Sequence, residues 1–87
     1  MSAFLIRRVE PIYPPEAKAN RIQGKVVLQA TIAKDGTVKN IRAVLGSPEL
    51  IAASIDAVRQ WRYKPYWLKG ENVEVDTEIT MTYRLAH

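Results

Sequence analysis

The chain has 87 residues and no cysteine, which excludes disulfides and thiolate metal sites. Its length suits one domain, so we treat residues 1–87 as a single unit, with residues 1–8 expected to be a poorly ordered or linker-derived lead-in. The net charge of +4 comes from scattered lysines and arginines without interleaved aromatic residues, so nucleic acid is not an expected partner. No stretch approaches the roughly 20 apolar residues of a membrane span.

A proline-rich segment comes first in the chain. Pro11, Pro14 and Pro15 prevent residues 10–14 from joining a helix or a sheet ladder. Pro15 suits the first turn of a helix, and Glu16 favours the positive end of the helix dipole. We therefore expect a short helix near Pro15–Arg21, which ends before Gly24.

A β-hairpin follows. Residues 25–32 alternate between apolar and polar, and Asp35-Gly36 supplies a tight turn after them. The return strand is expected from Thr37 to about Leu45. The apolar residues expected to face the core are Val26, Leu28, Ala30 and Ile32 in the first strand, and Val38, Ile41, Ala43 and Leu45 in the second. The three-residue step from Val38 to Ile41 predicts a β-bulge near Lys39-Asn40.

The next segment carries the signals of the main helix. Ser47 can cap it, Pro48 suits its first position, and Pro65 disfavours helix at the residue before it. We expect the helix to span Pro48–Tyr63. Its apolar stripe is Ile51, Ile55, Val58 and Trp61, and Trp61 is expected in the core.

The last segment alternates without interruption from Val73 to Leu85, with no proline or glycine. Thirteen residues at about 3.3 Å each would span roughly 43 Å. The two hairpin strands are too short to pair along all of it.

These elements predict an α+β fold with two layers in β-β-α-β order. Connectivity makes the last strand antiparallel to the first, and the sheet is expected to be three-stranded and antiparallel in the order 2-1-3. The main helix covers one face. The last strand then lies at an edge, where its unpaired main-chain groups can accept an extended peptide as a further strand.

The sequence offers no convergent set of catalytic or ligand-binding groups. The one histidine is His87, at the chain end, and the four glycines are isolated rather than clustered in a phosphate-binding loop. Glu74, Asp76 and Glu78 share one face of the last strand, where solvated charges are the simplest interpretation. We expect no enzymatic activity, cofactor or metal.

Several short motifs, in this order, resemble the TonB C-terminal domain over about residues 9–85. They are Tyr13-Pro14 with Ala17, Gly24-Lys25-Val26, Asp35-Gly36-Thr37-Val38, and the run from Ala57 through Trp61-Arg62-Tyr63 to Pro65. Each motif alone is weak. Their common order and spacing form a specific signature.

The resemblance implies a periplasmic domain, tethered to the inner membrane in the full-length protein. Such a domain pairs its edge strand with the TonB box of outer-membrane transporters, and couples a proton-driven inner-membrane motor to the import of nutrients such as iron-siderophores. The implied partner-binding residues are Ile79, Thr80, Met81, Thr82, Tyr83, Arg84 and Leu85 of the last strand, with Glu10, Pro11, Ile12, Tyr13 and Pro14 near the bound transporter.

Two alternatives stay open at this point. Related domains also occur in TolA-like envelope proteins and at the ends of membrane sensor proteins, where the partners differ. The same edge strand would also suit a self-associating structural module, which pairs with a second copy as a homodimer.

Overall fold

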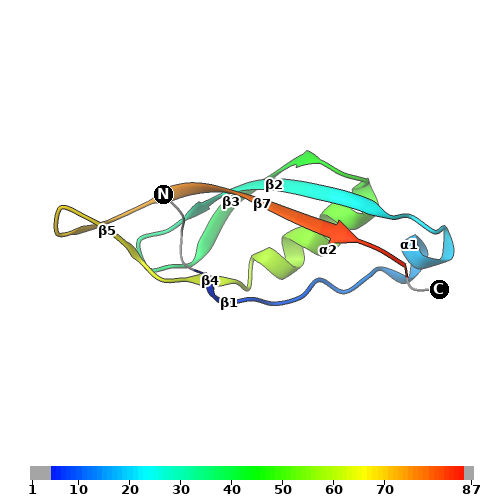
Figure 1. The fold of residues 1–87 in the computed structure, drawn as a ribbon, viewed down its shortest axis with the longest axis horizontal. Helices are drawn as coiled ribbons and strands as arrows, with labels where there is room; N and C mark the ends of the chain where they lie inside the picture. Colours follow the sequence, from blue (N-terminus) through cyan, green and yellow to red (C-terminus); the bar gives the residue numbers. More distant parts are fainter. Residues whose placement is uncertain (1–4, 86–87) are drawn as a thin grey trace.

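The computed structural model describes residues 5–85. The fold is elongated, with extents of 50 × 21 × 18 Å (Figure 1). The elements in chain order are β1 (Leu5–Arg7), α1 (Pro15–Ala19), β2 (Gly24–Ile32), β3 (Val38–Leu45), α2 (Pro48–Val58), β4 (Arg62–Tyr63), β5 (Tyr66–Leu68), β6 (Glu71–Val73) and β7 (Val75–Tyr83).

Strand β2 is the centre of the main sheet, whose order is β3-β2-β7 with both pairs antiparallel. This is the 2-1-3 arrangement expected from connectivity. The β2–β7 register runs without a shift from Gly24↔Tyr83 to Ile32↔Val75. A hairpin of β5 and β6 forms a separate two-stranded sheet at one end of the long axis (Figure 1).

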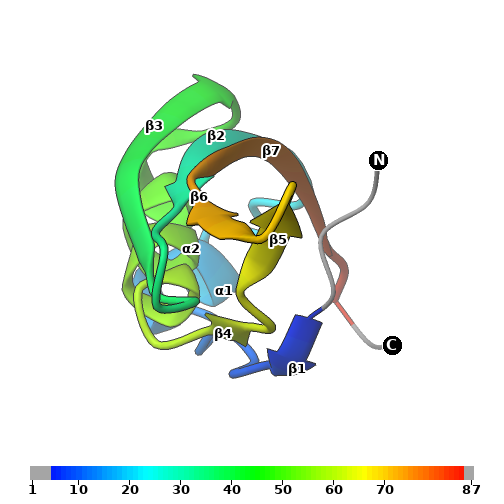
Figure 2. The ribbon, with the colours of Figure 1, turned by 90° about the vertical axis from the view of Figure 1, so that its left-hand side faces the viewer.

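The core lies between this sheet and a layer made of helices and the N-terminal segment (Figure 2). The alternating residues of β2 that were expected to face inward, Val26, Leu28, Ala30 and Ile32, are all buried. Helix α2 packs on β2 and β3. Leu5, Val9 and Tyr13 of the N-terminal segment pack against the same core and are partly buried.

The main helix is shorter than expected, because it ends at Val58 rather than at Tyr63. Residues 62–63 are extended and form β4, which pairs with β1. The extended backbone buries both Trp61 and Tyr63, and lets the Tyr63 N–H donate to the Gly36 carbonyl at 2.8 Å. A continuing helix would have kept that N–H inside its own hydrogen-bond ladder.

The apolar stripe expected for the helix is confirmed in part, because Val58 and Trp61 are buried. The buried residues of α2 are Leu50, Ser54, Ala57 and Val58, whereas the expected stripe members Ile51 and Ile55 are half-buried at its flank. Helix α1 ends at Ala19, two residues before the expected end. Arg21 has a φ of 53°, and this left-handed conformation terminates a helix.

The predicted bulge in β3 is confirmed. The β2–β3 register shifts between Gln29 and Thr31, opposite Asn40, which has a φ of 52°. A second shift lies between Val27 and Leu28. Each shift inserts a residue into β3 and turns the side chains that follow. Ala43 and Leu45 are both exposed, so the expectation that they belong to the core is wrong. Ala43 lies opposite the buried Leu28 but at the outer strand of the sheet, whereas Leu45 follows the second shift and lies opposite Val27.

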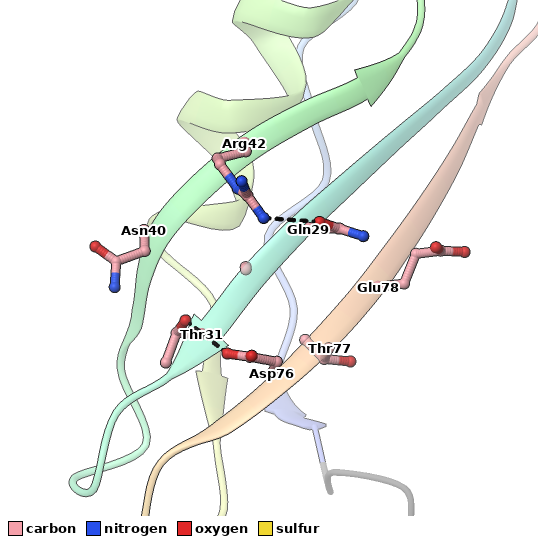
Figure 3. A pocket seen from close by; sticks show the side chains of 8 residues that line it. Gln29, Thr31, Asn40, Arg42, Asp76, Thr77 and Glu78 are labelled. Carbon is pink, nitrogen blue, oxygen red and sulfur yellow. Dashed lines mark hydrogen bonds between the residues drawn. The ribbon is translucent and has the colours of Figure 1, made fainter.

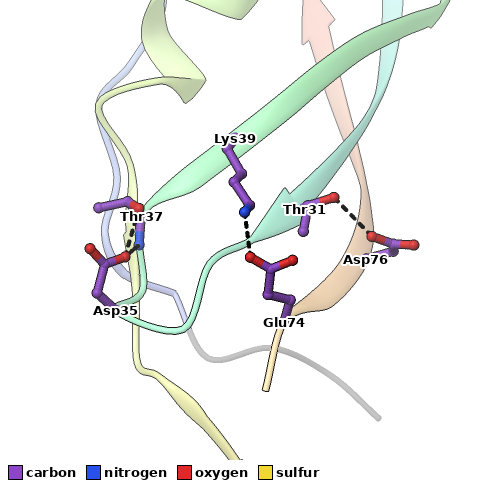
Figure 4. Close-up of polar contacts among 6 residues, drawn as sticks. All are labelled: Thr31, Asp35, Thr37, Lys39, Glu74 and Asp76. Atoms are coloured by element: carbon purple, nitrogen blue, oxygen red, sulfur yellow. Dashed lines mark hydrogen bonds and ion pairs between the residues drawn. The ribbon is translucent and has the colours of Figure 1, made fainter. Parts of the chain in front are cut away.

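The last segment is divided rather than continuous from Val73 to Leu85. Val73 belongs to the β5–β6 hairpin, and β7 has nine residues, which match the nine of β2. The length mismatch expected from the sequence does not arise, because β7 begins at Val75, opposite Ile32, which is the last residue of β2. An ion pair between Lys39 and Glu74 lies at the break (Figure 4).

Part of the lead-in expected over residues 1–8 forms strand β1 (Leu5–Arg7). Leu5 and Arg7 of β1 are opposite Tyr63 and Arg62 of β4. Residues 1–4 lie outside the described residues. The segment also contacts an aromatic side chain, because the Arg8 guanidinium lies 5.2 Å from the centre of the Trp61 ring.

The hairpin turn before β3 gives a test of this packing. Gly36 has a φ of 90°, and a methyl group added there would overlap the Tyr63 carbonyl oxygen. Gly70 has a φ of 82° with open space around it, so it is a matched control. We expect Gly70→Ala to lower the free energy of unfolding by about 1 kcal/mol, and Gly36→Ala by about 3 kcal/mol or more. Urea denaturation measures both, and equal losses would contradict the close approach of Gly36 to β4.

Candidate partner-binding edge of strand β7

Strand β7 pairs with β2 along one side only. Among residues 5–85, no strand pairs with its other side. Strand β1 does not cover this side of β7, because it pairs with β4. Alternate N–H and C=O groups of β7 therefore point away from β2, along an edge that is open within the described part of the chain.

The two edges of the main sheet differ in regularity. Strand β3 carries two register shifts, and the residue before it, Thr37, is bridged to Arg62. Strand β7 has no shift over nine residues and contains neither proline nor glycine. Bulges protect a sheet edge from added strands, because they disturb the spacing of the main-chain groups. The open side of β7 is therefore the better template for an extended chain.

Side chains on β7 alternate as the sequence indicates. Ile79, Met81 and Tyr83 are buried in the core, with exposures of 5%, 3% and 4%. Thr80, Thr82 and Arg84 are exposed on the other face, and Leu85 is half-buried after the strand has ended. Inward residues thus hold the strand in register, and the main chain itself is the feature left for a partner.

A hydrogen-bond chain fixes the C-terminal end of β7 to the helix. The Ser54 hydroxyl donates to the Leu50 carbonyl at 2.8 Å and lies 2.8 Å from the Tyr83 hydroxyl. Since Ser54 has one proton to donate, the Tyr83 hydroxyl is the donor between the two. Burial raises the pKa of Tyr83 above its ordinary value of 10.0.

Tyr13 joins the N-terminal segment to the same point. Its ring meets the Tyr83 ring edge-on, with centroids 5.4 Å apart and an interplanar angle of 86°. Its hydroxyl donates to the Ile22 carbonyl. Four residues earlier, the Val9 carbonyl accepts a hydrogen bond of 2.8 Å from Trp61 Nε1.

The structure thus brings only part of the predicted N-terminal set to β7. Tyr13 contacts Tyr83, but Glu10 forms an exposed ion pair with Arg8 at 2.9 Å. Ile12 and Pro14 line a separate groove against α2. Ser54 was missed, because a serine within a helical segment has no sequence signal that separates a buried role from an exposed one.

The sheet face opposite α2 carries a second, polar hollow (Figure 3). Arg42 donates to Gln29 at 2.9 Å, and Thr31 donates to Asp76 at 2.9 Å, so two of its polar pairs are cross-strand contacts. Similar local bonding occurs at the hairpin turn, where the Thr37 hydroxyl holds the pKa of Asp35 below 3.8 (Figure 4). Within residues 5–85 no three His, Cys, Asp or Glu side chains group as metal ligands would.

Neither of the helices in the described part of the chain is long and apolar enough to cross a membrane. The fold is a small α+β module, in which a three-stranded antiparallel sheet ends in a regular edge strand. The chain belongs to the family described as the Gram-negative bacterial TonB protein C-terminal, whose model matches residues 9–85.

Two curated relatives and one solved structure illustrate the match. The protein TonB of Escherichia coli K12 is 34% identical over 62 residues, which cover 69% of this chain and 26% of that protein. The protein TonB of Xanthomonas campestris pv. campestris strain B100 is 27% identical over 77 residues, covering 86% of this chain and 34% of that protein. This chain therefore spans about a quarter to a third of these relatives.

The solved structure supports the fold. The solution structure of the TonB C-terminal domain of Pseudomonas aeruginosa superposes with a TM-score of 0.81 at 24% identity. The superposition covers 98% of this chain and 88% of that one.

The Ser54–Tyr83 contact is tested by a double-mutant cycle. Ser54→Ala leaves the buried Tyr83 hydroxyl without its partner, so we expect it to lower the free energy of unfolding by about 1–3 kcal/mol. The Ser54→Ala/Tyr83→Phe double variant should lose less than the sum of the two single losses. Chemical denaturation of the four proteins gives the coupling, and strict additivity would show that the two hydroxyls do not interact.

Alkaline pH gives a second test of the same site. Because burial raises the pKa of Tyr83 in the folded protein, the folded state retains this proton longer than the unfolded state does. The associated stability is complete below pH 10 and is lost as the pH rises through the higher, folded-state pKa. We expect the wild type to lose more unfolding free energy between pH 9 and about pH 11 than Tyr83→Phe. Parallel stability curves for the two proteins would exclude this role.

Proposed function

We propose that this domain is the periplasmic, peptide-binding part of a TonB-type energy transducer. Its β7 edge pairs with the TonB box of outer-membrane transporters, which adds a fourth strand to the sheet. A proton-driven motor in the inner membrane pulls through the remainder of the protein, and this pull serves nutrient import, including iron-siderophore uptake. The observation that carries the proposal is the open, unbulged side of β7 in a TonB C-terminal family member.

The energetics of strand addition suit a reusable coupling. Each main-chain hydrogen bond contributes only about 0.5–1.5 kcal/mol net, so a short added strand binds with moderate affinity. Bonds along a strand share an applied pull, whereas one or two side-chain contacts would carry it alone. A partner bound in this way can sustain tension and still dissociate afterwards.

We place the main contact at Ile79 to Leu85, which includes the C-terminal half of β7. The hydrogen-bond chain from Ser54 and the ring of Tyr13 support this half of the strand. In the proposal, Glu10 to Pro14 lie near the bound transporter. Tyr13 is the member of that segment with a direct contact to β7, so it would carry the effect of a partner to the N-terminal segment.

The test is a pair of TonB-box peptides that differ only in the positions of N-methyl groups. One peptide is N-methylated at its odd-numbered residues and the other at its even-numbered residues. Strand addition uses only alternate N–H groups of the added chain, so one pattern should abolish binding and the other should largely preserve it. In NMR titrations with the unmodified peptide, the largest amide shifts should occur in residues 79–85.

Strand β3 is the internal control, because its edge is bulged. Shifts concentrated in Val38–Leu45, or equal binding of both methylated peptides, would contradict the proposed mode. Pairing of the same edge with a second copy is the alternative use of β7. It predicts that excess TonB-box peptide competes with self-association.

A further inference from the structure

Two exposed apolar features lie at opposite ends of the molecule (Figure 1), and the main-chain pairing proposed for β7 uses neither, although Ile12 of the second feature belongs to the segment proposed to lie near the transporter. The first is the tip of the β5–β6 hairpin, which we define as Trp67, Leu68 and Lys69. The exposed fractions are 61% for Trp67 and 49% for Leu68, which are high for such large apolar side chains. The hairpin projects along the long axis (Figure 1).

The hairpin is held rather than loose. Three residue pairs join its strands, from Tyr66↔Val73 to Leu68↔Glu71. Asn72, which lies opposite Trp67, donates from Nδ2 to the Lys34 carbonyl at 2.9 Å. The two apolar side chains of the tip are therefore presented on a fixed support, which lowers the entropy lost when they bind.

The second feature is a groove between the N-terminal segment and α2, near the opposite end of the molecule. Ile12, Pro15, Ala52 and Ala53 form its apolar walls, and Glu16 and Glu49 lie at its rim. Ile12 is 80% exposed. Neither glutamate has an ion pair or side-chain hydrogen bond within residues 5–85.

We propose that the hairpin tip of one copy of this chain docks into the groove of a second copy. The tip offers a large aromatic group, an aliphatic group and a lysine, and the groove offers apolar walls with two carboxylates that form no ion pair within residues 5–85. Lys69 is complementary in charge to these two glutamates, and Glu71, opposite Leu68, is the one acidic residue of the hairpin. The 50 Å length of the domain separates the two features, so they cannot meet within one copy.

The geometry of this contact differs from that of pairing through β7. Tip and groove are different surfaces, so the contact is heterologous, and each bound copy still has one free tip or groove. Copies therefore join head to tail into short chains. Two side chains in a shallow groove bury far less than about 1,200 Å², so the contact is transient and we expect it only above about 0.1 mM protein.

A mixing experiment tests the proposal directly. The groove-null variant is Glu16→Lys/Glu49→Lys, and the tip-null variant is Trp67→Ser/Lys69→Glu. By sedimentation velocity, the mean mass of the wild type should rise with concentration toward about 1 mM, while each variant alone stays monomeric. An equimolar mixture should form a 1:1 dimer and nothing larger, because the intact tip of one variant meets the intact groove of the other.

The mixture also guards against misfolding, since a dimer forms only if both variants retain their folds. Glu78→Lys changes a carboxylate on the far sheet face and should associate as the wild type does. A wild type that stays monomeric at about 1 mM would overturn the proposal. So would variants that associate alone, because pairing through β7 is independent of both features. Neither result would affect the TonB-box titration, so the two proposals can fail separately.

Discussion

The antiparallel ladder between β2 and β7 is the interaction on which the other features depend. Its nine residue pairs run without a shift, and it brings the last strand of the chain beside the first long one. The inward side chains of both strands fill the core that α2 and the N-terminal segment cover. Since one side of β7 is used in this ladder, the pairing with β2 fixes the register of the strand within a single copy of the chain. An edge that had to order itself on binding would lose part of its affinity to that ordering.

Aromatic residues connect this ladder to the other layer. Trp61 donates a hydrogen bond to the Val9 carbonyl, and the ring of Tyr13 contacts the ring of Tyr83. The hydroxyl of Tyr83 is hydrogen-bonded to Ser54 of α2. Helix, N-terminal segment and edge strand therefore meet at one end of β7. The alternation of polar and apolar residues in β7 specifies which face is inward, and these contacts fix where the strand ends.

Much of the sheet could be predicted from residue patterns. The inward face of β2, the Asp35-Gly36 turn and the bulge at Asn40 follow from local periodicity and turn chemistry. The errors occurred where tertiary contacts override local preference. Helix propensity favours a helix to Tyr63, but the Tyr63 N–H pairs with Gly36, which only the folded hairpin positions. The break before β7 likewise depends on where β2 ends.

The candidate site likewise has features that the sequence predicts and features that depend on tertiary contacts. The open edge could be inferred from connectivity, because an antiparallel last strand beside the first leaves one side unpaired. The different environments of Tyr13 and Ile12 could not be inferred from the sequence. Residues in an irregular segment follow no periodicity from which the face of each side chain could be predicted. Their contacts depend on the path of the segment past α2 and Tyr83.

The path of the N-terminal segment determines the order in which its contacts would break under a force applied at the N-terminal end of the domain. Strand β1 is joined to β4 by two residue pairs, so it should peel away first and at small cost. Peeling would then stop at Val9 and Tyr13, where a side-chain hydrogen bond and a ring contact fasten the segment to Trp61 and Tyr83. The short outer strand would thus detach and lengthen the N-terminal segment while the main sheet keeps its shape.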